Sequence, residues 1–327
     1  MATPPVDTGA AFRDDRPASW AVDRRDFLRV SLASIASMAA GGVTLVGRDQ
    51  ASSPRAGVRF GLLADPHYAD ANPVGTRFYR ESLPKVREAV DALRTARAEF
   101  LVELGDLKDM VAGEPDTRTL AYLTAIEAEI ARFGGPTYHV LGNHDMDNLS
   151  KAQFLGAVVN TGIGAKRASY AFTRGGIRFV TLDACCLADG TDYDHGNFDW
   201  RESYVPAPQL DWLRRELSSS TEPVVVFCHQ RLDAVSDPCV KNSPDVRSIL
   251  ESSGKVIAAF HGHDHPGRHA VINGIHYYTL KAVVEGTGVE NNAYAVVEVQ
   301  PDLNIVVTGY RRATSVTMGK SAGIEGA

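Results

Sequence analysis

The feature of this sequence that most constrains its fold is a regular alternation of short apolar runs, polar clusters and helical segments. The run Val-Arg-Phe-Gly-Leu-Leu-Ala over 58–64 ends at Asp65, a pattern typical of a buried strand. The same order returns in the first half of the chain, with apolar side chains at three- and four-residue spacing between the strands. It predicts the helices 80–98 and 119–132 and the strands 99–104 and 137–141. Strand, polar motif and helix alternate as they do in layered α/β folds.

The second half of the chain is richer in strands. Two apolar runs, 169–172 and 177–183, are joined by Thr-Arg-Gly-Gly, which predicts a hairpin. A short helix is expected over 208–217. Further strands are predicted at 223–227, 256–260, 275–284, 294–299 and 304–310. These elements suffice for one α/β domain, and we find no internal repeat.

The composition is that of an ordinary globular protein. Hydrophobic residues make up 44% of the 327 residues and charged residues 23%, so a sizeable core can form. The 34 basic and 40 acidic residues give a formal net charge of −6. This balance argues against a long nucleic acid as a partner, because such partners require a basic surface.

The N-terminal region differs from the rest of the chain. Residues 1–22 are rich in Pro, Ala, Asp and Arg without apolar periodicity, which is typical of a disordered leader. The paired Arg24 and Arg25 are followed by Phe-Leu and by an uncharged, weakly apolar stretch. The segment 23–47 therefore resembles a twin-arginine export signal.

This segment predicts export to the periplasm or the extracellular space, with the twin-arginine export machinery as a transient partner. A membrane anchor, or a soluble N-terminal helix of a cytoplasmic protein, is the alternative. The many Ser, Ala and Gly residues make the segment a poor spanning helix. The expected organisation is a leader (1–22), a signal segment (23–47), a linker (48–55), a main domain (56–312) and a C-terminal tail (313–327).

The four cysteines carry no sign of a zinc site. Cys185, Cys186, Cys228 and Cys239 lack paired C-x-x-C spacing. Cys185 and Cys186 are adjacent and poorly placed to bond each other, and Cys228 lies in an apolar run. We expect buried thiols, although an exported location would also permit a disulfide.

Five polar motifs follow predicted strands. They are Asp65-Pro66-His67, Gly105-Asp106, Gly142-Asn143-His144-Asp145, His229 and Gly262-His263-Asp264-His265. Open α/β sheets gather their ligands at the carboxyl ends of strands, so these side chains are expected to meet. Carboxylate, imidazole and amide oxygen donors together suit Mn, Fe or Zn better than Ca or Mg.

Each motif alone is weak, because a turn or a satisfied core histidine explains it equally well. Their joint order is far more specific than any single motif. The remaining histidines are interpreted as structural or surface residues, with core packing expected for the two in strands, His139 and His276. The other three are His195, His261 and His269.

The five motifs together resemble the signature of the calcineurin-like metallophosphoesterase superfamily: D-x-H, G-D, G-N-H-[DE], His and G-H-x-H. The resemblance implies a four-layer α-β-β-α sandwich of two mixed sheets flanked by helices, with a dimetal site at the strand ends. It implies that one divalent ion is held by Asp65, His67, Asp106 and His265. It implies that the other is held by Asp106, Asn143, His229 and His263, with Asp106 as the bridge.

The implied arrangement has a chemical reason. Two dications close together repel each other and need an anionic ligand between them. A hydroxide held there can attack phosphorus in line, while the metals neutralise phosphoryl charge. His144 directly follows a ligand, so we assign it as the general acid or as a phosphoryl contact, with Asp145 orienting its ring.

Two further comparisons narrow the resemblance. Purple acid phosphatases carry a Tyr three residues after the bridging Asp, whereas this chain has Asp109, which disfavours a Tyr-bound ferric site. Other stretches resemble manganese-dependent ADP-ribose/CDP-alcohol diphosphatases, although that group often has Gln at the position of His67. These stretches are Tyr68-Ala69-Asp70, Arg77-Phe78-Tyr79-Arg80-Glu81-Ser82-Leu83, Tyr138-His139-Val140 and Gln209-Leu210-Asp211-Trp212-Leu213.

Arg77, Tyr79 and Arg80 are candidate substrate contacts, because a guanidinium can bind a distal phosphate and an aromatic ring can stack on a base. A solvated helix start is the alternative. The predicted activity is hydrolysis of a phosphodiester, phosphomonoester or nucleotide pyrophosphate bond in a small phosphorylated substrate. A metal-dependent nuclease acting on short nucleic acids and a non-catalytic binding protein that keeps the fold are the rival hypotheses.

Overall fold

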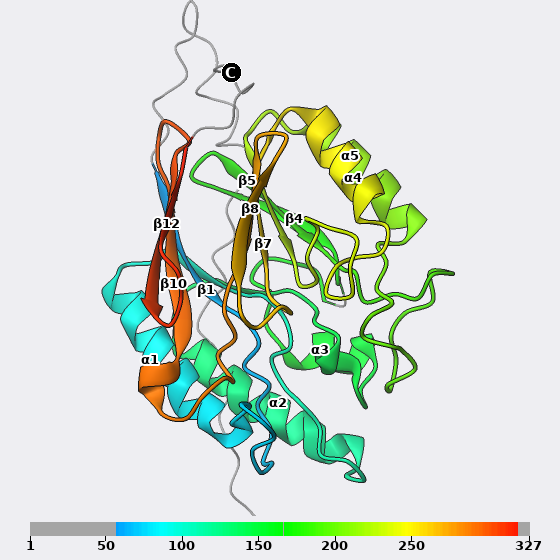
Figure 1. Ribbon diagram of the computed structural model, residues 1–327, viewed down its shortest axis with the longest axis vertical. Helices are drawn as coiled ribbons and strands as arrows, with labels where there is room; N and C mark the ends of the chain where they lie inside the picture. The colour runs from blue at the N-terminus through cyan, green and yellow to red at the C-terminus, as the bar shows by residue number, and fades with distance from the viewer. Residues whose placement is uncertain (1–56, 166, 320–327) are drawn as a thin grey trace, which may run out of the picture. The chain divides into compact units, whose positions relative to one another are not determined.

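Two six-stranded sheets packed face to face form the centre of the fold in the computed structural model (Figure 1). The structure describes residues 57–165 and 167–319, so the predicted leader, signal segment and linker lie outside the described residues. The first sheet has the order β12-β11-β10-β1-β2-β3. Its strands are β1 (Val58–Leu63), β2 (Phe100–Glu103), β3 (Thr137–His139), β10 (Ala293–Val299), β11 (Ile305–Arg311) and β12 (Val316–Met318).

The second sheet has the order β4-β5-β6-β7-β9-β8. Its strands are β4 (Tyr170–Arg174), β5 (Ile177–Leu182), β6 (Val224–Cys228), β7 (Val256–His261), β8 (Arg268–Ile272) and β9 (Ile275–Thr279). Both sheets are mixed: β1-β2-β3 and β5-β6-β7-β9 run parallel, and the remaining pairs are antiparallel. The carboxyl ends of several parallel strands therefore meet at one edge of each sheet.

Helices cover the outer face of each sheet. The first sheet packs against α1 (Ser82–Thr95), α2 (Asp116–Ala131) and α3 (Lys151–Ala157). The second packs against α4 (Ala207–Ser219) and α5 (Ser243–Ser253). Three short 3-10 segments complete the described elements: η2 (Tyr79–Glu81), η3 (His144–Met146) and η4 (Val289–Asn291). The expected four-layer sandwich is confirmed.

The two sheets are joined by an aromatic core. Phe60 of β1 stacks on Phe100 of β2, with ring centroids 5.0 Å apart. It also meets Phe179 and Phe227 of the second sheet edge-on, at 5.4 and 5.9 Å. Aromatic pairs of this kind contribute about 0.5–1.5 kcal/mol each beyond the apolar area that they bury. The core therefore fixes the strand ends of one sheet relative to those of the other.

The structure adds elements that the sequence analysis did not predict. Helices α3 and α5 and strand β8 fall in stretches that had been left without an element. Helix α3 begins with a capping box in which Ser150 and Gln153 bond each other's main chain. Strand β12 lies beyond residue 312, where the sequence analysis ended the domain, and it pairs with β11. The expected tail is thus partly a sheet strand.

Two further findings concern the cysteines and the question of a membrane-spanning helix. The four cysteines are all buried free thiols, as expected. Within residues 57–165 and 167–319, none of the helices combines the length and the apolar character that crossing a bilayer requires.

Candidate metal centre

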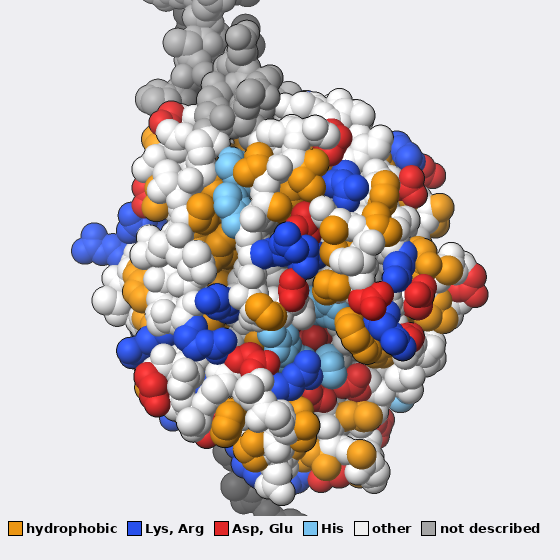
Figure 2. Space-filling view, viewed as in Figure 1, with side chains coloured by type: hydrophobic (Ala, Val, Ile, Leu, Met, Phe, Trp, Pro, Cys, Tyr) orange, Lys and Arg blue, Asp and Glu red, His pale blue; other side chains and the backbone are white. Residues whose placement is uncertain are grey.

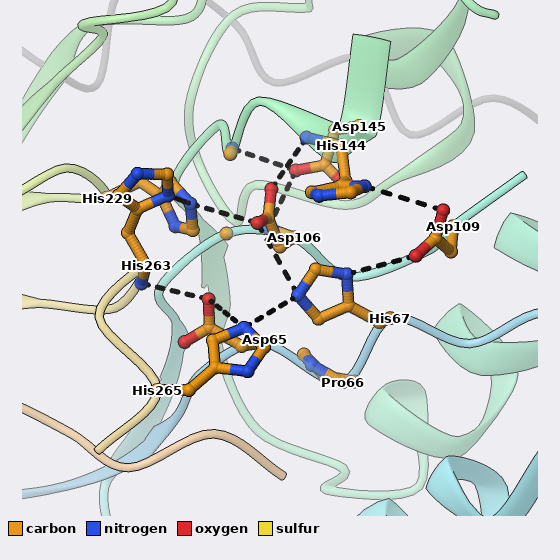
Figure 3. A network of polar contacts seen from close by, with 12 residues as sticks. Asp65, Pro66, His67, Asp106, Asp109, His144, Asp145, His229, His263 and His265 are labelled. Carbon is orange, nitrogen blue, oxygen red and sulfur yellow. Dashed lines mark hydrogen bonds and ion pairs between the residues drawn. The ribbon is translucent and has the colours of Figure 1, made fainter. Parts of the chain in front are cut away.

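The polar motifs converge at the carboxyl ends of parallel strands from both sheets (Figure 3). In the first sheet, Asp65 and His67 follow β1, Asp106 follows β2 and Asn143 follows β3. In the second sheet, His229 follows β6, and His263 and His265 follow β7. All seven side chains are buried or half-buried. The structure therefore brings together every metal ligand that the sequence predicted.

The backbone at this edge is strained. Four of the seven residues have positive φ: Asp65 (54°), His67 (47°), Asp106 (56°) and His263 (66°). This left-handed conformation costs a non-glycine residue about 1–2 kcal/mol. Main-chain hydrogen bonds hold it in place, since the Asp65 amide donates to the Gly105 carbonyl at 3.0 Å and the His67 amide to the Asp106 carbonyl at 2.8 Å. The strain falls on residues whose side chains turn into the centre, as expected of a functional site.

Two glycines allow the loops to approach one another. A Cβ atom on Gly142 would lie 2.1 Å from the backbone nitrogen of Asp106, and one on Gly105 would lie 2.5 Å from Nδ1 of His229. Both distances are far inside van der Waals contact. The glycines of the G-D and G-N-H-D motifs are therefore required by packing around Asp106 and His229.

The first ligand group consists of Asp65, His67 and His265. Nε2 of His67 lies 3.1 Å from Nε2 of His265, and that nitrogen lies 3.9 Å from Oδ1 of Asp65. The three side chains can offer ligand atoms within 4.8 Å of one another. Oδ2 of Asp106 is 3.5 Å from Nε2 of His67, so the Asp106 carboxylate borders this group.

The second ligand group consists of Asp106, His229 and His263. The same Oδ2 of Asp106 lies 3.2 Å from Nε2 of His229, and that nitrogen lies 3.2 Å from Nδ1 of His263. A single carboxylate oxygen is therefore shared between the two groups. This is the position that a bridging ligand between two cations requires.

The donor atoms fit a pair of cations. Oδ2 of Asp65, Oδ1 of Asn143 and Nε2 of His263 are buried and have no hydrogen-bond partner within the described part of the chain. A buried polar atom left without a partner costs about 1–3 kcal/mol. Two divalent ions between the strand ends would satisfy the two oxygen atoms, and the mixed nitrogen and oxygen donors of the site suit transition metals.

The protonation states also suit metal binding. Burial would raise the pKa of Asp106, but the neighbouring His229 and His144 lower it well below its usual value. Burial lowers the pKa of His67 to about 3 and also lowers that of His263, so both rings are neutral. Burial opposes the charge on His229, yet Asp106 raises its pKa to about 9. A cation bound beside Asp106 would displace that proton, since a ligating imidazole must be neutral.

The ring of His144 is held by two carboxylates. Its Nδ1 lies 2.9 Å from Oδ2 of Asp147 and 3.4 Å from Oδ1 of Asp109 (Figure 3 shows Asp109). Burial lowers the pKa of His144, but Asp106, Asp109 and Asp147 together raise it well above its usual value. One ring nitrogen of His144 is therefore held by a carboxylate, and the acidic surroundings favour the protonated ring.

The expected role of Asp145 is wrong. Its carboxylate does not contact the His144 ring and instead accepts main-chain amides, from Gly142 at 2.8 Å, Leu107 at 3.0 Å and Asp106 at 3.1 Å. Asp145 is buried, and it ties the loop after β2 to the loop after β3. The residue that orients His144 is Asp147, one turn of η3 further along. The sequence does contain a sign of this contact, because Asp147 lies three residues after His144, the spacing that one 3-10 turn brings together.

Two further contacts support the ligand histidines, and the sequence analysis did not find them. Nδ1 of His265 lies 2.6 Å from Oε1 of Glu285, and this hydrogen bond lowers the pKa of Glu285 to about 2. A carboxylate behind a ligating histidine fixes its ring and strengthens its donor nitrogen. The buried Arg231 binds Asp264 at 2.6 Å and thereby joins the loop after β6 to the loop after β7.

A cavity of about 740 Å³ opens over the centre. Its volume is in the range of small-molecule sites. Figure 2 shows histidine side chains in a hollow of this face, with acidic and basic side chains around it. The lining residues are Thr76, Arg77, Asp106, Asn143, His144, Trp200, Pro238, His263, Asp264, His265 and Glu285.

The three candidate substrate contacts have different positions. Arg77 lies in the cavity wall. Tyr79 and Arg80 are absent from the cavity lining; the guanidinium of Arg80 instead binds the side chains of Asp70 and Asn72 on the surface. The interpretation of this segment as a solvated helix start therefore fits Arg80, and the substrate-contact interpretation is kept for Arg77.

The remaining histidines lie outside the ligand groups. His139 is buried between Glu103, at 3.3 Å, and Glu127, at 3.1 Å, which is a structural role. His276 was expected in the core but is half-buried beside His269, with ring nitrogens 3.1 Å apart. His276 lies on β9, which is next to the edge strand β8, so its side chain is near the exposed edge of the second sheet.

This donor set, at the strand ends of a two-sheet sandwich, defines a class of metal-dependent phosphate hydrolases. The family model described as calcineurin-like phosphoesterase matches residues 58–267 of the chain. The chain belongs to the calcineurin-like phosphoesterase family. It is an enzyme that hydrolyses ester or anhydride bonds of phosphate.

Individual relatives are also similar over most of their length. A manganese-dependent ADP-ribose/CDP-alcohol diphosphatase of Oryza sativa is 29% identical, over 76% of this chain and 90% of that protein. The protein of the same description from Danio rerio is 29% identical, over 79% of this chain and 97% of its own length. The crystal structure of a dimetal phosphatase from Danio rerio aligns with a TM-score of 0.70 and 27% identity, covering 82% of this chain and all of that one.

Proposed function

We propose that this enzyme hydrolyses the diphosphate linkage of small nucleotide derivatives of the ADP-ribose and CDP-alcohol type, with manganese as the metal. The observation that carries the proposal is the single Asp106 oxygen shared by two ligand groups on the floor of a cavity that also presents His144 and Arg77. The relatives described as manganese-dependent diphosphatases support the substrate class and the metal.

The ligands proposed for one ion are Asp65, His67, Asp106 and His265, and those for the other are Asp106, Asn143, His229 and His263. Two dications there supply Lewis acidity for the phosphoryl oxygens and for activation of water. The chain's own residues then complete the site by positioning the substrate and by moving a proton.

His144 is proposed as the general acid. Its Nδ1 is held by Asp147, so Nε2 carries the proton that can pass to the leaving phosphate oxygen. The carboxylates around His144 raise its pKa, which favours the protonated form that a general acid requires. Arg77 lies in the same cavity wall, where its planar guanidinium can bind the second phosphate of a diphosphate through paired hydrogen bonds.

A substrate panel tests this proposal. The protein is reconstituted with Mn and assayed on ADP-ribose, CDP-choline, an aryl phosphate, a bis-aryl phosphate, a cyclic nucleotide and single-stranded DNA. We expect the highest kcat/KM for the two nucleotide diphosphates, and a loss of about 100-fold or more in kcat for His144→Ala. Arg77→Ala is expected to weaken the nucleotide diphosphates more than the aryl phosphate.

The panel also separates the rival functions. Preference for single-stranded DNA would support the nuclease. No turnover on any substrate, with wild type equal to His144→Ala, would support a binding protein. An equal loss on all substrates in Arg77→Ala would refute its role in specificity while leaving the hydrolase in place.

We further propose that the protein is exported through the twin-arginine machinery. The paired Arg24 and Arg25 before an uncharged stretch support this, and the segment lies outside the described residues. Mass spectrometry of the mature N-terminus after fractionation is the test. A full-length chain found only in the cytoplasm, unchanged by replacing both arginines with Lys, would contradict export.

A further inference from the structure

The long segment between β5 and α4 brings an aromatic side chain to the metal centre. Trp200 lies on this segment, and 47% of the residue is exposed. It lines the cavity over the centre and also a neighbouring cavity of about 330 Å³. Asn143 and His144 line both cavities as well, whereas Arg77 lines only the first. Trp200 therefore lies beside Asn143 and His144 in both cavities and shares the first of them with Arg77.

The segment that carries Trp200 is hydrogen-bonded to the catalytic loop, which is the stretch from Gly142 to Leu149 that contains His144 and η3. The Gly196 amide donates to the carbonyl of Met146 at 2.9 Å, and the His195 amide donates to that of Leu149 at 3.1 Å. Met146 belongs to η3, the 3-10 segment that begins at His144. These main-chain hydrogen bonds therefore fix the segment that carries Trp200 relative to His144, the proposed general acid.

Side chains fix the rest of the segment. Tyr193 is fully buried and stacks on Phe198, with ring centroids 4.1 Å apart, and its hydroxyl donates to the carbonyl of Glu202 at 3.0 Å. Phe198 lines the neighbouring cavity together with Trp200. An aromatic side chain on so well anchored a loop is a preorganised contact, because little conformational entropy remains to be lost on binding.

The surroundings of the indole favour a flat heterocycle. Its ring centroid is 5.8 Å from that of His263, and the guanidinium of Arg201 lies 5.9 Å from the indole centroid. Arg201 is itself bound to the carboxylate of Asp199. A planar aromatic ring beside the proposed position of the diphosphate offers a surface on which a base can stack, and a phosphomonoester without a base would leave that surface unused.

We propose that Trp200 is the platform on which the nucleobase of a nucleoside diphosphate substrate stacks, with the diphosphate over Asn143 and His144. This inference rests on the proposed function and specifies its base-binding subsite. Stacking tolerates different bases, because every base has a π face. The same platform therefore accepts adenine and cytosine derivatives alike.

Kinetics on matched substrates test the platform. ADP-ribose and CDP-choline are compared with a dialkyl diphosphate diester, which has the same linkage and no base. In Trp200→Ala the ratio of kcat/KM for either nucleotide to that for the dialkyl diester is expected to fall about tenfold or more, mostly through KM. Trp200→Phe should keep most of the ratio, and the control Val271→Ala, exposed on the edge strand β8, should keep all of it. An unchanged ratio in Trp200→Ala would overturn the inference.

Fluorescence gives a second measurement that is independent of turnover. The chain has three tryptophans, Trp20, Trp200 and Trp212. Stacking of ADP should quench tryptophan emission in the wild type and in the matched control Trp212→Phe, but not in Trp200→Phe. Quenching that persists in Trp200→Phe would refute the platform. Quenching without hydrolysis of any diphosphate would instead refute the proposed function and leave the platform standing.

Discussion

At the scale of single residues, the ring of His144 is oriented by carboxylates that are not among the proposed metal ligands. Asp147 contacts its Nδ1 at 2.9 Å and Asp109 lies 3.4 Å away. In the motif G-N-H-D, Asp145 is the neighbour in sequence, but its carboxylate accepts four main-chain amides. Proximity in sequence therefore indicated the wrong carboxylate. The 3-10 turn of η3 places the residue three positions on, not the next one, beside the ring.

This arrangement predicts a shifted pH profile for Asp147→Asn. Removing the carboxylate lowers the raised pKa of His144, and the protonated ring is the active form. Activity should therefore be lost at a lower pH than in the wild type, with kcat reduced about tenfold near neutral pH. The measurement is kcat against pH with Mn at saturation.

Asp194→Asn is the matched control, since Asp194 also contacts a histidine, His195, at an exposed site. Its profile should equal that of the wild type. If Asp147→Asn kept the wild-type alkaline limb, Asp147 would not contribute to the raised pKa of His144.

At the scale of elements, the catalytic loop and the Trp200 segment meet at Gly196. This glycine has a φ of 73°, and a Cβ atom there would lie 2.7 Å from the carbonyl oxygen of Asp147. A side chain would push the segment away from η3 and would break the hydrogen bond to Met146.

Gly196→Ala is therefore expected to lower the free energy of unfolding by about 2 kcal/mol or more, from the left-handed backbone and the steric contact together. Gly113→Ala is the control, because Gly113 has a φ of 83° but no atom within 4 Å of its Cβ position. It should cost only about 1 kcal/mol. Chemical denaturation measures both, and equal losses would mean that the contact with Asp147 is relieved cheaply.

The elements differ in how far the sequence could predict them. The parallel strands were predicted because they are buried on both faces and read as apolar runs, as β6 and β7 do. Strand β8 was missed because it is an exposed edge strand with the sequence RHAVI. In α5 the apolar Val246, Ile249 and Leu250 have helical spacing but span little more than one turn. Short elements whose burial comes from tertiary packing give too little periodicity to identify.

At the scale of the whole molecule, the centre exists because two sheets bring their strand ends to one place. The ligands were predictable because each lies within four residues of the end of its strand and falls in a short motif. Their supporting residues were not, because the contacts cross long stretches of sequence. Glu285 meets His265 from 20 positions away and Arg231 meets Asp264 from 33. No local pattern marks such pairs, and Trp200 likewise lies in a segment without periodicity.

The assembly of the centre from both sheets predicts that metal stabilises the fold as a whole. Among the described residues, buried oxygen atoms of Asp65 and Asn143 have no hydrogen-bond partner, and ring nitrogens of the ligand histidines lie 3.1 and 3.2 Å apart, close enough to share a cation. An ion present at about 100 times its Kd adds about 2.7 kcal/mol to the free energy of unfolding. For a domain of this size that corresponds to a rise in Tm of about 5–10 °C.

Calorimetry of chelator-treated protein, with and without added Mn, measures this shift. Asp106→Asn should lose most of it, because the bridging charge is gone while the side-chain volume is kept. Asp194→Asn, on the exposed loop, should retain it in full. A Tm that is independent of Mn in the wild type would mean that the apoprotein already satisfies its buried donors. The two-cation centre would then have to be abandoned, whereas a shift confined to the wild type and Asp194→Asn would place the stabilising ions at Asp106, where the two sheets meet.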